Sequence, residues 1–243
     1  MVLLALDTTT RAGSAAVVAD DRLVAEHELT SERSYAEQLP GTLLSVLACV
    51  GVELSAVDVF AVAAGPGSFT GLRIGIATIQ GLAFTTGRRI VTVSALEALA
   101  HAGSRGLAPG ELVGAWMDAH RRDVFAALYR VADAPSSVLD RLVELESPSI
   151  GSPAAIMTRW AAEFGVPAAL VGDGAVAYEA MAGPGTVVKP TPTLAGTIGR
   201  VAAGRARLGQ TIDPAAVQPL YVRRSDAEIG RDLAGRNAPP RQG

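Results

Sequence analysis

A glycine-rich run between two apolar segments is the part of the sequence with the clearest potential for chemistry. Gly65, Pro66 and Gly67 follow a strand-like stretch, and Ser68 then leads into a long apolar helix pattern. Two glycines around a proline predict a tight turn whose backbone N–H groups can approach another surface closely. Such a turn is also a common phosphate cradle, because the following helix N-terminus offers N–H groups and positive potential. Gly67 and Ser68 are therefore candidate phosphate-binding residues.

The end of the first predicted strand offers a second candidate for the same chemistry. Asp7 and Thr8 follow the apolar run 2–6, so a carboxylate and a hydroxyl could face a phosphate group. Alternatively, these side chains form an Asx or Ser/Thr turn that satisfies backbone N–H groups after the strand. The glycine spacing matches neither the P-loop nor the dinucleotide fingerprint, and the single lysine, Lys189, lies in a Pro-rich loop. Both interpretations of Asp7 and Thr8 stay open.

Residues suited to metal or nucleic-acid chemistry are few. His27, His101 and His120 are far apart, and none has a second histidine at helical spacing. We therefore predict no metal and no cofactor, with His27 and His101 as surface or capping residues. The net charge of −3 argues against autonomous nucleic-acid binding. The charged stretch from Asp118 to Arg122 predicts a hairpin turn with solvated charges, or alternatively a recognition loop whose arginines meet phosphate or carboxylate groups.

Two apolar helices predict a protein interface. One runs from Ser34 to about Val50 and the other from Thr70 to Phe84. The second helix is apolar on two faces, so one face should cover the sheet and the other should need a second cover. Glycines four residues apart would let a partner helix approach closely. We predict an interface of Leu39, Leu43, Gly71, Leu72, Gly75, Ile76 and Ile79, whereas Ile74, Ala77, Gly81 and Phe84 line the other face of the second helix.

The order of strands and helices predicts an α/β protein with two lobes. Capping signals at Ser94 and Ser152 mark helix starts in each half. We predict an N-terminal lobe at 1–106, a smaller C-terminal lobe at 107–224 whose last helix can pack back on the first lobe, and a disordered tail at 225–243. The N-terminus has no basic leader and no apolar run is long enough to span a bilayer, so we expect a cytoplasmic protein.

The glycine run, read from Ala64 to Ile76, resembles the signature of the TsaB (YeaZ) family. Further pieces agree in order along the chain, and the resemblance spans about residues 2–224. Where relatives usually carry a histidine at the start of the first helix, this chain has Ser34, so the role of that histidine does not transfer. The other matching pieces are Leu4–Thr9, Leu39-Pro40, Asp118-Ala119, Gly172-Asp173-Gly174 and Pro219–Arg223.

The resemblance implies a two-lobed fold of the actin, Hsp-seventy and sugar-kinase (ASKHA) type with a reduced second lobe. It also implies a non-catalytic scaffold subunit. Such a subunit pairs with TsaD, which threonylcarbamoylates adenosine 37 in tRNAs reading ANN codons, and with the ATPase TsaE. tRNA would be met only through this complex, and the isolated chain would form a homodimer through its apolar helices. The alternative is an ATP-dependent phosphotransferase or ATPase of the same fold that uses Asp7 and the glycine turn for phosphates.

Overall fold

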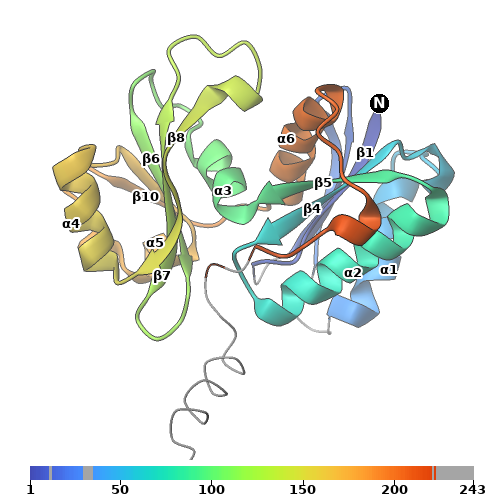
Figure 1. Cartoon of the computed structure of the whole chain (residues 1–243), viewed down its shortest axis with the longest axis horizontal. Coiled ribbons are helices and arrows are strands. Elements are labelled where there is room, and N and C mark those ends of the chain that lie inside the picture. The colour runs from blue at the N-terminus through green and yellow to red at the C-terminus, as the bar shows by residue number, and fades with distance from the viewer. Residues whose placement is uncertain (11–12, 30–34, 221, 223–243) are drawn as a thin grey trace, which may run out of the picture.

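The computed structural model describes residues 1–10, 13–29, 35–220 and 222, and within these ranges two five-stranded sheets carry the fold (Figure 1). Each sheet is the centre of one lobe. Ser34 and the predicted tail at 225–243 lie outside the described residues. None of the helices in the described ranges has the length and apolar character needed to cross a membrane.

The first sheet has apolar side chains on both faces because helices cover both. Its strand order is β3 (Arg22–Glu28), β2 (Ser14–Ala19), β1 (Val2–Asp7), β4 (Val59–Gly65) and β5 (Arg89–Ser94). β1, β4 and β5 are parallel, and β2 pairs antiparallel with both β1 and β3. Because side chains alternate along a strand, Leu4 and Leu6 pack under α1 (Tyr35–Ala48) and α2 (Phe69–Thr86). Leu3 and Ala5 pack under α6 (Ala195–Arg207) on the other face.

The second sheet also has helices on both faces, and these helices are shorter than those of the first lobe. Its order is β10 (Val187–Lys189), β9 (Ala169–Val171), β6 (Leu112–Asp118), β7 (Val124–Val131) and β8 (Leu142–Gly151). One face packs against α4 (Pro153–Glu163) and α5 (Asp173–Ala177), where the Trp116 and Trp160 ring centroids lie 6.0 Å apart. The other face packs against α3 (Ala95–Gly103), which lies between the lobes.

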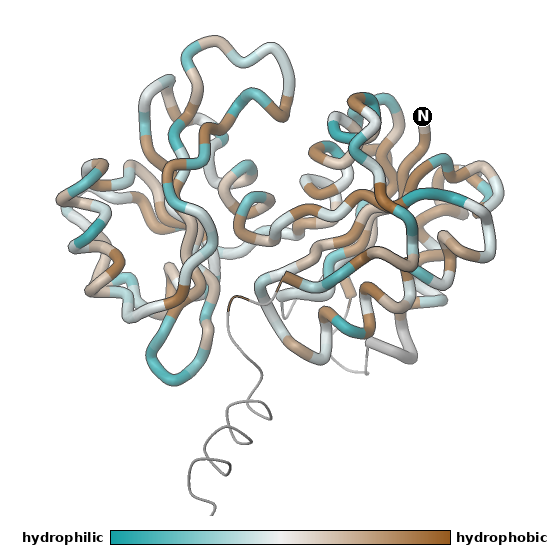
Figure 2. Tube along the Cα trace, viewed as in Figure 1, coloured by the Kyte–Doolittle hydropathy of each residue, from teal (hydrophilic) through white to brown (hydrophobic). Residues whose placement is uncertain are grey.

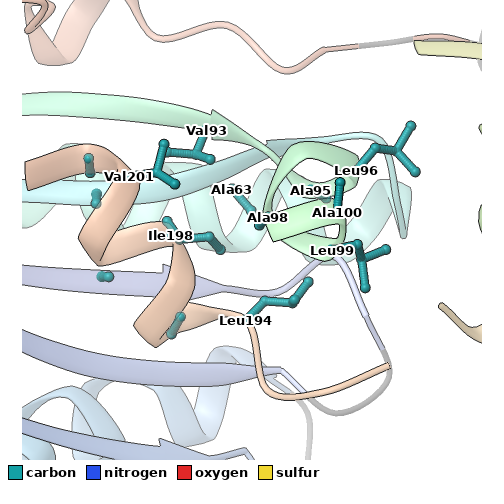
Figure 3. Close-up of a cluster of buried hydrophobic side chains, with 14 of the residues drawn as sticks. Ala63, Val93, Ala95, Leu96, Ala98, Leu99, Ala100, Leu194, Ile198 and Val201 are labelled. Carbon is teal, nitrogen blue, oxygen red and sulfur yellow. The ribbon is translucent and has the colours of Figure 1, made fainter. Parts of the chain in front are cut away.

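One hydrophobic cluster runs from the first sheet through α6 and α3 to the second sheet. Figure 3 shows its centre, with Ile198 and Val201 of α6 near Val93 of β5 and Ala98 of α3. In Figure 2 the strands at the centre of each lobe are rich in hydrophobic residues, whereas the β6–β7 hairpin tip is hydrophilic. The short 3₁₀ helices η1 (Leu54–Ala56), η2 (Leu139–Arg141), η3 (Glu179–Met181) and η4 (Pro214–Ala216) lie in the connections.

The predicted helix starts are confirmed where capping signals were clear. Ser94 accepts the N–H of Glu97 at the start of α3, and Ser152 caps α4. The sequence patterns do not predict β8, because its glutamates and Pro148 interrupt the apolar alternation. β8 is an edge strand of its sheet, where charges and proline are tolerated.

Candidate functional site

The two predicted phosphate loops meet at the C-terminal ends of β1 and β4, which are neighbouring parallel strands. The Ser68 N–H donates to the Thr9 carbonyl oxygen at 3.1 Å. At Gly67, where φ is +156°, an added Cβ would lie 2.6 Å from both Cβ and the carbonyl oxygen of Thr9. The glycine turn is therefore packed directly on Thr9, and this close approach requires a glycine.

Asp7 is fully buried and organises its own turn. Its Oδ1 accepts the Thr9 N–H at 2.8 Å and the Thr9 hydroxyl at 2.6 Å, and its Oδ2 accepts the Thr10 hydroxyl at 3.0 Å. Burial raises the pKa of the Asp7 carboxyl; the hydrogen bonds from Thr9 and Thr10 oppose this rise, and the charge of Glu26 adds to it. These contacts form an Asx turn that closes the end of β1.

The Thr8 and Ser68 side chains are also used within the chain. The Thr8 hydroxyl donates to the Gly71 carbonyl oxygen at 2.8 Å, and Ser68 Oγ caps α2 by accepting the Gly71 N–H at 3.2 Å. Because the two loops touch, a phosphate group could enter between them only if they moved apart. The geometry favours the turn interpretation of Asp7, Thr8, Gly67 and Ser68.

Gly71 and Gly75 face the chain's own Thr8. An added Cβ at Gly71 would overlap the Thr8 carbonyl oxygen, and one at Gly75 would overlap Thr8 Oγ1. The close approach of α2 to the end of β1 therefore accounts for two glycines four residues apart. The prediction that they admit a partner helix is wrong, because Thr8 fills that space.

The other predicted interface residues are buried in the core of the first lobe. Each is at most 5 % exposed and packs between the first sheet and helices α1 and α2. They cannot contact a partner in this fold, so the sequence prediction chose the wrong face of each helix. These residues are Leu39, Leu43, Leu72, Ile76 and Ile79.

The opposite faces of α1 and α2 form an exposed apolar surface, called here the α1–α2 face. Leu44 is 57 % exposed and Phe84 is 78 % exposed. An added Cβ at Gly41 or Gly81 would meet no atom within 4 Å, so both glycines are open to solvent. The face is defined by Gly41, Leu44, Ala48, Ala77, Gly81 and Phe84.

This face is almost free of charge. Among the described side chains of the two helices, Arg73 is the only charged one, and its guanidinium lies 4.0 Å from the centre of the Phe69 ring. A surface helix ordinarily carries charged and polar residues on its solvent side. Depletion of charge on an exposed apolar patch is instead typical of the centre of a protein interface.

The turn between β6 and β7 has an uncommon backbone. His120, Arg121 and Arg122 have φ values of 58°, 55° and 69°, a left-handed region that non-glycine residues rarely adopt. Asp118 Oδ1 accepts the His120 N–H at 2.9 Å, and the Asp123 N–H donates to the His120 carbonyl oxygen at 3.0 Å. The predicted hairpin turn is confirmed, and a role in recognition stays a prediction.

The histidines do not gather. His101 is only 5 % exposed, which corrects the prediction of a surface or capping residue. Burial lowers its pKa to about 4, and the charges of Arg200, Arg205 and Arg141 act in the same direction. Within the part of the chain that the structure describes, no three His, Cys, Asp or Glu side chains are placed to hold a metal ion.

Comparison with known proteins shows where this arrangement recurs. The family model of tRNA N6-adenosine threonylcarbamoyltransferase (TsaD) matches residues 24–181. A crystal structure from Pseudomonas aeruginosa, described as an uncharacterized protein with similarity to peptidase YEAZ, is 30 % identical with a TM-score of 0.77. The match covers 91 % of this chain and 99 % of that chain. The chain belongs to the TsaB (YeaZ) family.

Curated TsaB relatives match over a shorter range. The tRNA threonylcarbamoyladenosine biosynthesis protein TsaB of Haemophilus influenzae is 37 % identical over 125 residues, which cover 51 % of this chain and 52 % of the relative. The Escherichia coli protein of the same name is 34 % identical over 130 residues, with 54 % and 55 % covered. The chain thus spans about half the length of these relatives. The predicted two-lobed α/β fold is confirmed, since a YeaZ structure from Pseudomonas aeruginosa shares it with a TM-score of 0.74.

Two of the TsaB-like sequence pieces meet in space, which sequence reasoning did not foresee. The Leu220 N–H donates to the Ala64 carbonyl oxygen at 2.7 Å, and an added Cβ at Gly65 would lie 2.9 Å from the Leu220 carbonyl oxygen. Earlier in the segment that leads from α6 to Leu220, Ile212 pairs with Ile90 of β5. This segment therefore crosses the first lobe and contacts the glycine turn at Leu220. Separation by about 150 residues in sequence hides this contact.

Proposed function

We propose that this chain is a non-catalytic scaffold subunit in tRNA threonylcarbamoyladenosine biosynthesis. It pairs with a TsaD-like catalytic subunit for threonylcarbamoylation of adenosine 37 in tRNAs that read ANN codons. A TsaE-like ATPase joins them in the cytoplasm. This chain contacts tRNA only as part of the complex. The names and similarity of its TsaB relatives support the pathway.

The α1–α2 face is the observation that carries the scaffold proposal. It combines exposed Leu44 and Phe84 with open glycines, and Arg73 is the only charged residue among the described side chains of its two helices. Covering such a face removes apolar area from water without burying unpaired charges. The partner is a helix-bearing protein, because small residues at Gly41 and Gly81 allow close helix approach. In isolation, the same face binds a second copy and gives a twofold homodimer.

The closed phosphate loops support the absence of catalysis by this subunit. Asp7 and Ser68 bind groups of their own turns, and Gly67 lies against Thr9. A phosphotransferase or ATPase would need these groups free to orient phosphate oxygens and a metal ion. The catalytic chemistry is therefore assigned to the partner.

The test is association of a charged variant of the α1–α2 face. Ala77→Glu with Gly81→Glu places two carboxylates one turn apart on the exposed side of α2, where an added Cβ at Gly81 meets nothing. The monomer should stay folded, because glutamate is a better helix former than glycine. Copurification with the TsaD-like protein and sedimentation of the isolated chain should both show at least about tenfold weaker association, which is about 1.4 kcal/mol.

Val187→Glu is the matched control, since Val187 is 57 % exposed on β10 in the other lobe. It should leave both associations unchanged. If the double variant binds as the wild type does, or if Val187→Glu weakens binding equally, the face is not the interface. Stoichiometric ATP binding with turnover by the isolated chain would instead favour the phosphotransferase or ATPase alternative.

A further inference from the structure

The two lobes share α3, so the chain crosses from the first lobe to the second at the β5–α3 junction. α3 packs on β6, β7 and β9 of the second sheet, and also on α6, β4 and β5 of the first lobe. Two lobes move relative to one another by default unless their interface is large and hydrophobic, and here one hydrophobic cluster runs from the first sheet through α6 and α3 to the second. The contacts that bridge this junction therefore decide whether the inter-lobe angle is free.

Arg205 of α6 bonds both sides of the crossing point. Its Nη1 donates to the Thr92 carbonyl oxygen in β5 at 3.0 Å. Its Nη2 donates to both carboxylate oxygens of Glu97 in α3, at 2.7 and 2.9 Å. The Glu97 and Arg205 side chains are only 17 % and 27 % exposed, so solvent screens this pair less than a surface pair. Rotation of α3 relative to β5 would break these bonds.

The connection between β7 and β8 reaches from the second lobe to the same two helices (Figure 1). Leu139 of η2 lies against α6 at Gly204, where an added Cβ would be 2.8 Å from Leu139 Cγ. Two residues later, Arg141 donates to the carbonyl oxygen of Ser104 at 2.7 Å and to its hydroxyl at 3.0 Å. η2 therefore holds the end of α3 with one residue and contacts α6 with another.

The end of α3 is fixed to the second sheet from a further side. Lys189 of β10 donates to the Gly103 carbonyl oxygen at 2.7 Å. Cations commonly bind the last carbonyl groups of a helix in this way. α3 is therefore held to the second lobe, and relative motion of the lobes must occur where α3 packs against α6, β4 and β5 of the first lobe. Glu97–Arg205 and Leu139–Gly204 both cross that plane.

We infer that Arg205 and η2 form a latch that fixes the angle between the two lobes, so that the chain is a single rigid body. The inference goes beyond the proposed function and does not depend on which protein binds the α1–α2 face. A latched joint means that neither lobe closes on a ligand. His101 of α3 lies buried at this joint, where the charges of Arg200 and Arg205 of α6 act on it.

The test measures one inter-lobe distance by pulsed electron spin resonance. Cys49, the only cysteine, is exposed next to α1 and takes one spin label; Glu163→Cys, exposed at the end of α4, provides the other. Dilution with unlabelled protein removes distances between copies. The latch variant combines Arg205→Met with Leu139→Ala, and Leu139→Ala alone is the milder version.

Arg207→Met is the matched control. Arg207 lies on the same helix as Arg205, but its ion pair with Asp21 stays within the first lobe. We expect one narrow distance distribution for the unmodified latch and for Arg207→Met. The latch variant should broaden or split it, and Leu139→Ala alone should broaden it less. Near-ultraviolet circular dichroism of the Trp116–Trp160 pair checks that the second lobe stays folded. A broad distribution with the latch intact, or an unchanged one in both latch variants, would overturn the inference.

Discussion

Asp7 combines full burial with hydrogen bonds from its own loop, and its protonation should therefore be linked to folding. Because burial raises its pKa, the folded chain holds the proton more tightly than the unfolded chain does. Stability from this group is fully present below the unfolded pKa of about 3.9 and is lost as the pH rises to the folded value.

We expect Asp7→Asn to become progressively more stable than the wild type as the pH rises above the unfolded pKa of about 3.9, because it keeps an oxygen acceptor and has no charge. Urea unfolding at several pH values measures this difference. Below the unfolded pKa, Asp7→Ala should lose about 1–3 kcal/mol, since the Thr9 and Thr10 donors lose their acceptor, and the loss should shrink as the pH rises because alanine does not ionise. Asp133→Asn, at an exposed aspartate, is the control. A flat or opposite pH trend for Asp7→Asn would contradict the buried turn.

Gly75 is buried and Gly81 is exposed on α2, so the two glycines provide a matched pair. Gly75→Ala should destabilise the monomer by about 1–3 kcal/mol, because the new methyl group displaces the Thr8 hydroxyl. Gly81→Ala meets no atom and should stabilise it by up to about 1 kcal/mol through helix propensity. Denaturant unfolding at concentrations where the wild type is monomeric compares them. Equal effects of the two substitutions would place Gly75 on the surface.

At the scale of single residues, the sequence predicted which groups come together but not what they do there. Asp7, Thr8, Gly67 and Ser68 were expected at one site, and strand order alone brings them to one edge of the sheet. Whether the two loops leave a gap depends on small differences in the distances between Gly67 and Thr9. No residue pattern encodes such a gap, so both interpretations had to stay open.

Among the elements, α2 shows most clearly where sequence reasoning stops. Both of its faces are apolar, so its helical period could not say which one covers the sheet. The structure assigns Leu72, Ile76 and Ile79 to the core and leaves Ala77 and Phe84 outside. Glycine contacts with Thr8 fix that orientation, and they depend on a residue more than 60 positions earlier.

The β6–β7 hairpin carries a prediction of its own. A left-handed backbone costs a non-glycine residue about 1–2 kcal/mol, whereas glycine loses about 0.5–1 kcal/mol of extra chain entropy on folding. Arg122→Gly should therefore raise stability by a few tenths to about 1 kcal/mol. Arg130→Gly, exposed in extended β7, should lower it by about 0.5–1 kcal/mol. Thermal melts measure both, and a loss in Arg122→Gly would show that the Arg122 side chain is needed at the tip.

For the whole molecule, composition and element order predicted two α/β lobes, and the TsaB resemblance supplied the fold type. The sharing of α3 between the lobes was not predictable, because it depends on which surfaces of α3 and α6 face each other. The contacts of Arg205, Leu139 and Leu220 also join distant segments. Such contacts determine whether two lobes behave as an enzyme cleft or as a rigid platform.

Reconstituted threonylcarbamoylation of tRNA tests the central claim most directly. The TsaD-like and TsaE-like proteins of the same organism are combined with this chain, and modified adenosine is quantified. We predict no product from this chain alone, product when the wild type joins its partners, and loss of product with the Ala77→Glu and Gly81→Glu variant. The control variant Val187→Glu should give as much product as the wild type. Modification by this chain alone, or undiminished modification with the double variant, would contradict a non-catalytic scaffold that acts through the α1–α2 face.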